Sequence, residues 1–274
     1  MPEPNDSATP TSLRALDALN FFLADVRDGL GPYLAIYLTS RLHWDPSRVG
    51  VAMAAMLVGT VVAQTPAGAL IDRVRWKRMA VAVAAGVVAL GCILMITVPT
   101  FPVIVAAQAT VGVASTLFPA AIAALSLGIV GHAKLAARTG RNEAFNHAGN
   151  VAAAVLAGAA GYFVGYWTIF YLVAAMAAAS SVSVLRIREE DIDHELARGA
   201  SGDEGERAGV EGIGGLFRDR RILVFFVAAV LFHFANAAML PLVGQKLTVG
   251  MSRGVSVLMS ACMGSLHETE YIAR

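Results

Sequence analysis

The sequence predicts an all-α protein that crosses a membrane several times. Hydrophobic residues make up 57% of the chain, charged residues make up 15%, and the mean hydropathy is +0.63. Soluble domains average about 45–50% apolar and about 25% charged residues. The apolar residues fall in runs of about 20, the length that an α-helix needs to cross a bilayer. A chain of 274 residues is too short to bury such helices in a soluble core, so we expect them to lie in lipid.

Seven apolar runs are the expected membrane spans. They cover residues 15–39, 48–70, 79–98, 102–130, 143–165, 167–186 and 221–245. Helix-breaking prolines follow the first and third runs, at Pro46 and Pro99, and basic clusters follow the second and fourth. We therefore expect a polar tail at residues 1–12 and a six-helix transmembrane bundle at residues 13–186.

The chain after the sixth run changes character. Residues 187–220 begin with acidic side chains and continue as a Gly-rich, charged stretch, which is typical of a solvated linker. Residues 221–249 then begin a second bundle with a seventh helix. Residues 250–274 start as an apolar stretch of about 10 residues, too short to span a bilayer, so we interpret them as an incomplete or frameshifted tail.

The Lys and Arg residues between the runs predict the orientation. The connections after the second, fourth and sixth runs carry fourteen of them, and the opposite connections carry four. Basic loops stay on the cytoplasmic side. We therefore expect a multi-pass protein of the cytoplasmic (inner) membrane with a cytoplasmic N-terminus, and a linker on the same side.

The first run is unusual because it holds charged residues. Asp17, Asp25, Arg27 and Asp28 lie in or close to it, and each charge at mid-bilayer costs about 2.5–3.5 kcal/mol or more. One interpretation is a substrate or proton site at Asp25, Arg27 and Asp28. The alternative is an internal ion pair that orients this helix.

A polar stripe marks the start of the fifth run. Glu143, Asn146, His147 and Asn150 recur at steps of three and four residues, so they share one helix face. A gate or proton relay through His147 is one interpretation. Helix capping with inter-helix hydrogen bonds is the other.

The segment between the second and third runs carries a spaced motif. Gly68 and Asp72 precede a basic cluster formed by Arg73, Arg75, Lys77 and Arg78. This pattern resembles the cytoplasmic signature of the major facilitator superfamily, and the six-span-plus-linker layout agrees with it. The resemblance covers residues 13 to about 250.

The resemblance implies a transport function with a cavity lined by the first, fourth and seventh helices. The residues it would place in contact with a substrate are Asn20, Asp25, Gln108, Thr116, His233 and Asn236. Asp25 or Asp28 would couple transport to protons. The expected function is secondary active transport of a small organic solute by alternating access, and the alternative is a passive channel or a non-transporting scaffold.

Other function classes find little support. A net charge of +1 gives no reason to expect a nucleic-acid partner. The chain shows no phosphate-binding loop, no metal-ligand spacing and no nucleophile elbow. We therefore expect no enzyme activity, no cofactor and no metal, and we expect lipid, a small-molecule substrate and protons as partners.

Overall fold

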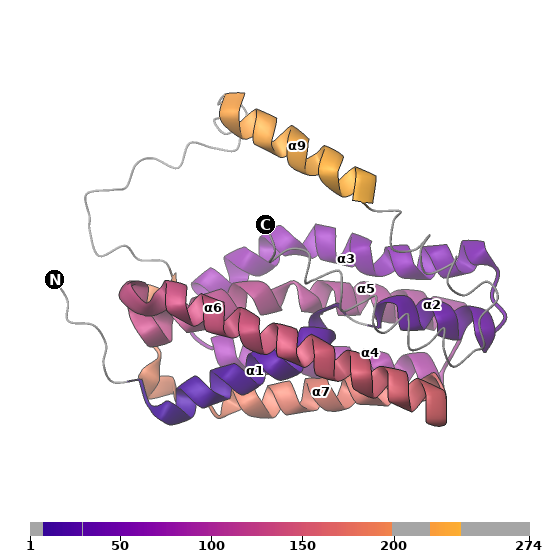
Figure 1. The fold of residues 1–274 in the computed structure, drawn as a ribbon, viewed down its shortest axis with the longest axis horizontal. Coiled ribbons are helices and arrows are strands. Elements are labelled where there is room, and N and C mark those ends of the chain that lie inside the picture. Colours follow the sequence, from indigo (N-terminus) through magenta and orange to yellow (C-terminus); the bar gives the residue numbers. More distant parts are fainter. Residues whose placement is uncertain (1–7, 29, 199–219, 237–274) are drawn as a thin grey trace.

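The structure, a computed structural model, describes residues 8–28, 30–198 and 220–236, and it is helical throughout its regular elements (Figure 1). This confirms the predicted all-α class. In chain order the elements are α1 (Pro10–Asp28), α2 (Gly31–Ser40), α3 (Pro46–Arg73), α4 (Lys77–Thr97), α5 (Phe101–Ser115), α6 (Leu117–Phe163), α7 (Trp167–Leu185), the short 3₁₀ turns η1 (Glu189–Asp191) and η2 (Leu196–Arg198), and α9 (Arg220–Asn236).

The helices form an elongated bundle with α9 drawn apart from it (Figure 1). Four helical stretches in the described part are long and apolar enough to cross a membrane: Pro46–Arg73, Lys77–Thr97, Phe101–Phe163 and Trp167–Leu185. Large apolar side chains also point outward, for example Leu57, Val61 and Val62 on α3. Outward apolar surface on long helices is what a bilayer requires, so the bundle is that of a membrane protein.

The first expected run is two helices rather than one. α1 ends at Asp28 and α2 begins at Gly31 with a proline in its first turn. A proline here lacks the N–H that would continue the α1 ladder. α1 also begins at Pro10, so the expected polar tail ends before residue 12.

The segment expected to connect the fourth and fifth runs is helical. Within α6 (Leu117–Phe163) two helices meet at a kink, because Gly131 has a non-helical φ of 69° and ψ of 173°. Residues 132–142 are rich in Ala, Leu, Lys and Arg, which favour helix strongly enough to start the second of these helices ahead of the fifth apolar run. The expected fourth span is divided at Thr116, because Pro119 cannot donate to the Ser115 carbonyl.

Close contacts between backbones hold the helices together. A Cβ atom added at Gly112 on α5 would collide with the backbone of Met56 on α3, and one added at Gly59 on α3 would collide with the backbone of Ala109 on α5. Gly149 on α6 meets the backbone of Phe21 on α1 in the same way. Small residues at these crossings let membrane helices approach each other.

Residues 187–198, called the strap below, pack against one end of the bundle. The Asp191 carboxylate accepts hydrogen bonds from the hydroxyls of Thr9 (2.5 Å) and Ser12 (2.6 Å) near the start of α1. The backbone N–H of Asp193 donates to the Gly128 carbonyl of α6 at 2.9 Å. This part of the expected solvated linker is therefore folded, because its carboxylates find hydroxyl and guanidinium partners on the bundle.

Candidate functional site

A cavity of about 750 Å³ opens between α1, α3, α6 and the strap. Its polar lining comes from two carboxylates, three amides, two hydroxyls and one guanidinium group, and its remaining lining is apolar. The polar lining residues are Asn20, Asp72, Ser126, Thr139, Asn142, Glu143, Asn146 and Arg198. Ligand sites in proteins are typically clefts of roughly 300–1,000 Å³ with a few placed polar groups, and this cavity has both properties.

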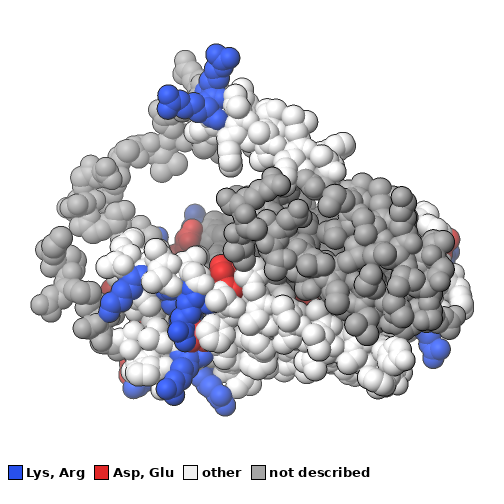
Figure 2. Space-filling view, in the orientation of Figure 1, with Lys and Arg blue, Asp and Glu red and all other residues white. Residues whose placement is uncertain are grey.

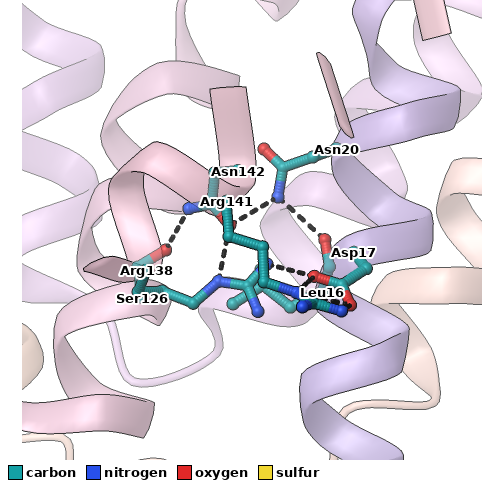
Figure 3. A network of polar contacts seen from close by, with 7 residues as sticks. All are labelled: Leu16, Asp17, Asn20, Ser126, Arg138, Arg141 and Asn142. Atoms are coloured by element: carbon teal, nitrogen blue, oxygen red, sulfur yellow. Dashed lines mark hydrogen bonds and ion pairs between the residues drawn. The ribbon is translucent and has the colours of Figure 1, made fainter. Parts of the chain in front are cut away.

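An ion-pair network lies behind one wall of the cavity and joins α1 to α6 (Figure 3). Arg138 Nη2 donates to Asp17 Oδ1 at 2.5 Å. Arg141 donates to both carboxylate oxygens of Asp17, from Nε to Oδ1 at 3.0 Å and from Nη2 to Oδ2 at 2.8 Å. The side chains of Asp17 and Arg138 are 7% and 4% exposed, whereas that of Arg141 is 59% exposed. The buried carboxylate is thus fully compensated by two guanidinium groups.

The same network orients the amides of the cavity wall. Arg138 Nε donates to Asn142 Oδ1 at 2.7 Å, and Asn142 Nδ2 donates to the Ser126 hydroxyl at 2.8 Å. Asn20 Nδ2 donates to Asn142 Oδ1 at 3.1 Å and to the Leu16 carbonyl at 2.8 Å. Asn20, Ser126 and Asn142 all line the cavity, so the ion pair fixes the position of groups that face it.

The expected substrate-contacting residues that the structure describes do not all lie at one site. Asn20 lines the cavity, and Asp25 is half-buried in α1. Gln108 is buried on α5, where neither of its amide atoms has a hydrogen-bond partner among the described residues, and the Thr116 hydroxyl donates to the Val113 carbonyl at 2.6 Å. The remaining expected residues are Arg27, Asp28, His233 and Asn236, whose side chains lie outside the described part.

The signature residues lie at the end of the bundle near the strap. Gly68 and Asp72 line the cavity, while Arg73 is exposed. The Lys77 ammonium is buried and donates to the Val74 carbonyl at 2.8 Å.

The other two basic residues of the signature contact the strap. Arg78 donates to the Ile187 carbonyl and to the Glu189 carboxylate. Arg75 forms a looser pair with Glu195, at 3.9 Å. The motif thus anchors the strap as well as contributing to the cavity.

The candidate gate residues divide between the cavity and the helix interior. Glu143 and Asn146 line the cavity, and His147 is half-buried one turn further along α6. Asn150 has a buried Nδ2 that forms no hydrogen bond within the described ranges. The cavity therefore brings together one residue from the expected substrate site, two from the signature and two from the candidate gate.

Sequence reasoning missed the residues that organise the wall. Arg138 and Arg141 counted only as basic loop residues, and Ser126 and Asn142 had no assigned role. The signal that would have found them is an acid inside α1, Asp17, together with arginines spaced three residues apart on another helix. For metals, the described ranges bring no three His, Cys, Asp or Glu side chains together in a metal-binding group.

Comparison with known proteins identifies the relatives of this chain. Residues 16–266 match the family model described as Major Facilitator Superfamily. Two proteins described as uncharacterized MFS-type transporters, from two strains of Mycobacterium tuberculosis, are each 46% identical over 255 residues. The alignment covers 93% of this chain and 61% of each relative. The chain thus spans about three fifths of the length of the curated relatives it matches.

Proposed function

The chain belongs to the Major Facilitator Superfamily, and on that premise we propose that it acts in secondary active transport of a small organic solute by alternating access. The observation that carries the proposal is the cavity lined by Asn20, Asp72 and Glu143. Polar groups around an open space, inside a bundle whose outer surface is apolar, are what a solute pathway through a membrane needs.

The proposed location is the cytoplasmic membrane, and the proposed orientation has the N-terminus of the chain on the cytoplasmic side. In Figure 2 the visible Lys and Arg side chains of the bundle gather mainly at the end where α1 begins and α6 bends. That end carries the strap and the signature cluster. The excess of positive charge supports a cytoplasmic location for it.

The proposed driving force is a proton gradient that acts through Asp25 or Asp28 on α1. Asp25 is half-buried within the helix rather than at its start. An ionisable carboxyl at membrane depth marks an ion or proton path more often than a structural element. Protonation of such a group during each cycle would couple the solute to the gradient.

The test is reconstitution of the 274-residue chain into liposomes that contain a pH-sensitive dye. Single solutes from a panel of small amines, sugars and carboxylic acids are added outside, with and without a pH gradient. We expect at least one solute to move protons with the protein present, and Asp25→Asn to abolish that movement while Glu190→Gln preserves it. Solute flux without any gradient would indicate a channel, and no flux for any solute would indicate a scaffold.

A further inference from the structure

We infer that the cavity binds organic cations, and in particular solutes that carry an ammonium group on an apolar body. The inference rests on the proposed function, since it names the solute class for the same cavity. It is carried by a difference between the carboxylates that line the cavity and those elsewhere in the bundle and strap.

The carboxylates of the bundle and strap that lie away from the cavity have partners of their own, which are basic side chains for most of them and hydroxyl or backbone N–H donors for Asp191 and Asp193. Asp17 is paired with Arg138 and Arg141. Glu189 pairs with Arg78, and Glu190 pairs with Arg188 at 2.7 Å. The fold thus supplies these acids with cations of its own.

The two carboxylates that line the cavity differ. Asp72 and Glu143 form no ion pair with any residue in the described part of the chain. Arg198 is the cation in the lining, and it is 3.5 Å from the Glu195 carboxylate on the strap. The cavity lining therefore carries two carboxylates against one guanidinium group, and an excess of negative charge raises the local concentration of cations.

The network behind the wall keeps its own positive charge away from the cavity. Glu143 directly follows Asn142 on α6, and the nearest cations on that helix are Arg138 and Arg141. Both of these guanidinium groups donate to Asp17 on the α1 side. An anionic solute would therefore be repelled by two carboxylates that form no ion pair in the described part of the chain. The neighbouring arginines would not attract it, because both already donate to Asp17.

Asn20, which lines the cavity, keeps its acceptor oxygen out of the network. Both bonds that Asn20 forms in the network use its Nδ2 atom, to Leu16 and to Asn142. Its oxygen points away from the network in Figure 3. An ammonium group has three donors and no acceptor, so the Glu143 carboxylate and the Asn20 oxygen match its chemistry.

The rest of the lining suits an apolar body attached to that ammonium group. Leu23, Pro119, Ile122, Leu127 and Leu135 contribute apolar surface to the cavity. The volume of about 750 Å³ has room for one or two aromatic rings with an alkyl chain. An amphiphilic amine thus satisfies both parts of the lining, whereas a sugar would leave the apolar part in contact with hydroxyl groups.

The test measures equilibrium binding of dansylcadaverine, a fluorescent amphiphilic primary amine, to the purified 274-residue chain in nanodiscs. N-acetyldansylcadaverine is the matched neutral probe, because it differs only at the amine. We expect the amine to bind at least tenfold more tightly than its neutral analogue, since a hydrogen bond to a charged group is worth about that much. We expect Glu143→Gln to remove that difference, and Asp72→Asn to reduce it.

Glu190→Gln is the control variant, because Glu190 is exposed, is paired with Arg188 and lies outside the cavity. Size-exclusion profiles establish that each variant stays folded. Equal binding of both probes, or an amine preference that survives in the Glu143→Gln, Asp72→Asn double variant, would overturn the inference.

Flux measured on the same preparation separates the two proposals. Amine binding that depends on Glu143, without any solute flux, would support the cation site and count against the transport function. Flux of neutral or acidic solutes without amine binding would support transport and overturn the cation site.

Discussion

Asp17 and Arg138 lie 121 residues apart in the chain, yet Asp17 Oδ1 accepts a 2.5 Å hydrogen bond from Arg138 Nη2. Both side chains are almost completely buried. Arg141 adds a second, more exposed partner to the same carboxylate. Because Arg138 also orients Asn142, this pair connects the packing of α1 on α6 with the shape of the cavity wall.

Asp17→Ala is expected to destabilise the bundle by about 3–5 kcal/mol, because it leaves the Arg138 guanidinium buried without a counter-charge. Arg138→Ala is expected to cost less, since Asp17 keeps Arg141 as a partner. Arg141→Ala is expected to have the smallest effect of the three because its side chain is largely exposed. Thermal unfolding of the purified variants in detergent measures the order.

Arg48→Ala is the control for that series, because it removes an exposed pair with Asp45 at the other end of the bundle. Its unfolding temperature is expected to stay close to that of the unsubstituted chain. Equal losses for Asp17→Ala and Arg48→Ala would contradict the assigned role of the buried pair.

Gly149→Ala is expected to separate α1 from α6 and to lower the unfolding temperature. Its new Cβ atom would collide with the Phe21 backbone, which cannot move aside as a flexible side chain can. Gly140→Ala, on the same helix, meets no atom within 4 Å and is expected to be neutral or stabilising by up to about 1 kcal/mol. Comparable melting curves for the two variants would show that the close α1–α6 approach is wrong.

Gly131→Ala tests the break inside α6. The φ of 69° and ψ of 173° at this residue form a conformation that side chains with a Cβ rarely adopt. Such strain costs about 1–3 kcal/mol, although a Cβ atom there would meet open space. A chemical-denaturant titration compares this variant with Gly140→Ala, and a gain in stability for both would contradict the break.

Asp191 is expected to make the attachment of the strap depend on pH. Burial raises the pKa of this carboxyl, but hydrogen bonds from Ser12 and Thr9 outweigh that effect and hold the pKa below its ordinary value of 3.8. A lowered pKa in the folded state stabilises the fold above pH 3.8, and this contribution is lost as the pH falls toward the lowered value. Asp191→Asn is expected to remove that part of the acid sensitivity.

Unfolding temperatures of the Asp191→Asn variant and the unsubstituted chain, measured between pH 6 and pH 3, check the dependence. Glu190→Gln serves as the control. The Glu190 carboxylate is next to Asp191 in the chain, but it is exposed and accepts no hydrogen bond from a hydroxyl group among the hydrogen bonds of the strap. If the Asp191→Asn variant loses stability over this range as steeply as the unsubstituted chain, the hydrogen bonds to Asp191 are not stabilising.

The membrane-bundle class could be predicted from the sequence because it depends on local properties. Runs of apolar residues indicate burial in lipid without any knowledge of their neighbours, and the division of the first run into α1 and α2 is explained by Gly31 and Pro32 at the start of α2. The helical structure of residues 132–142, after the break at Gly131, was missed. Its Lys and Arg residues suggested a loop, while their helix propensity was the stronger influence.

The organisation of the site could not be predicted in the same way. The partners of Asp17 lie on a helix whose position depends on tertiary packing, so no local pattern names Arg138 or Asn142. The acidic strap suggested a solvated chain because its partners, Thr9, Ser12 and Arg78, lie far from it in the sequence. Residues predicted from their helix face, such as Glu143 and Asn146, did converge with Asn20 at one cavity.

The most direct test of the cavity as the solute site is protection of a cysteine placed inside it. Asn146→Cys is introduced with Cys92→Ser and Cys262→Ser, and its rate of alkylation by a maleimide is measured with and without dansylcadaverine. A Glu190→Cys variant in the same background reports on the strap surface outside the cavity. We expect the amine to slow alkylation at position 146 severalfold and to leave position 190 unchanged. Equal rates with and without the amine at position 146 would contradict the assignment of the cavity.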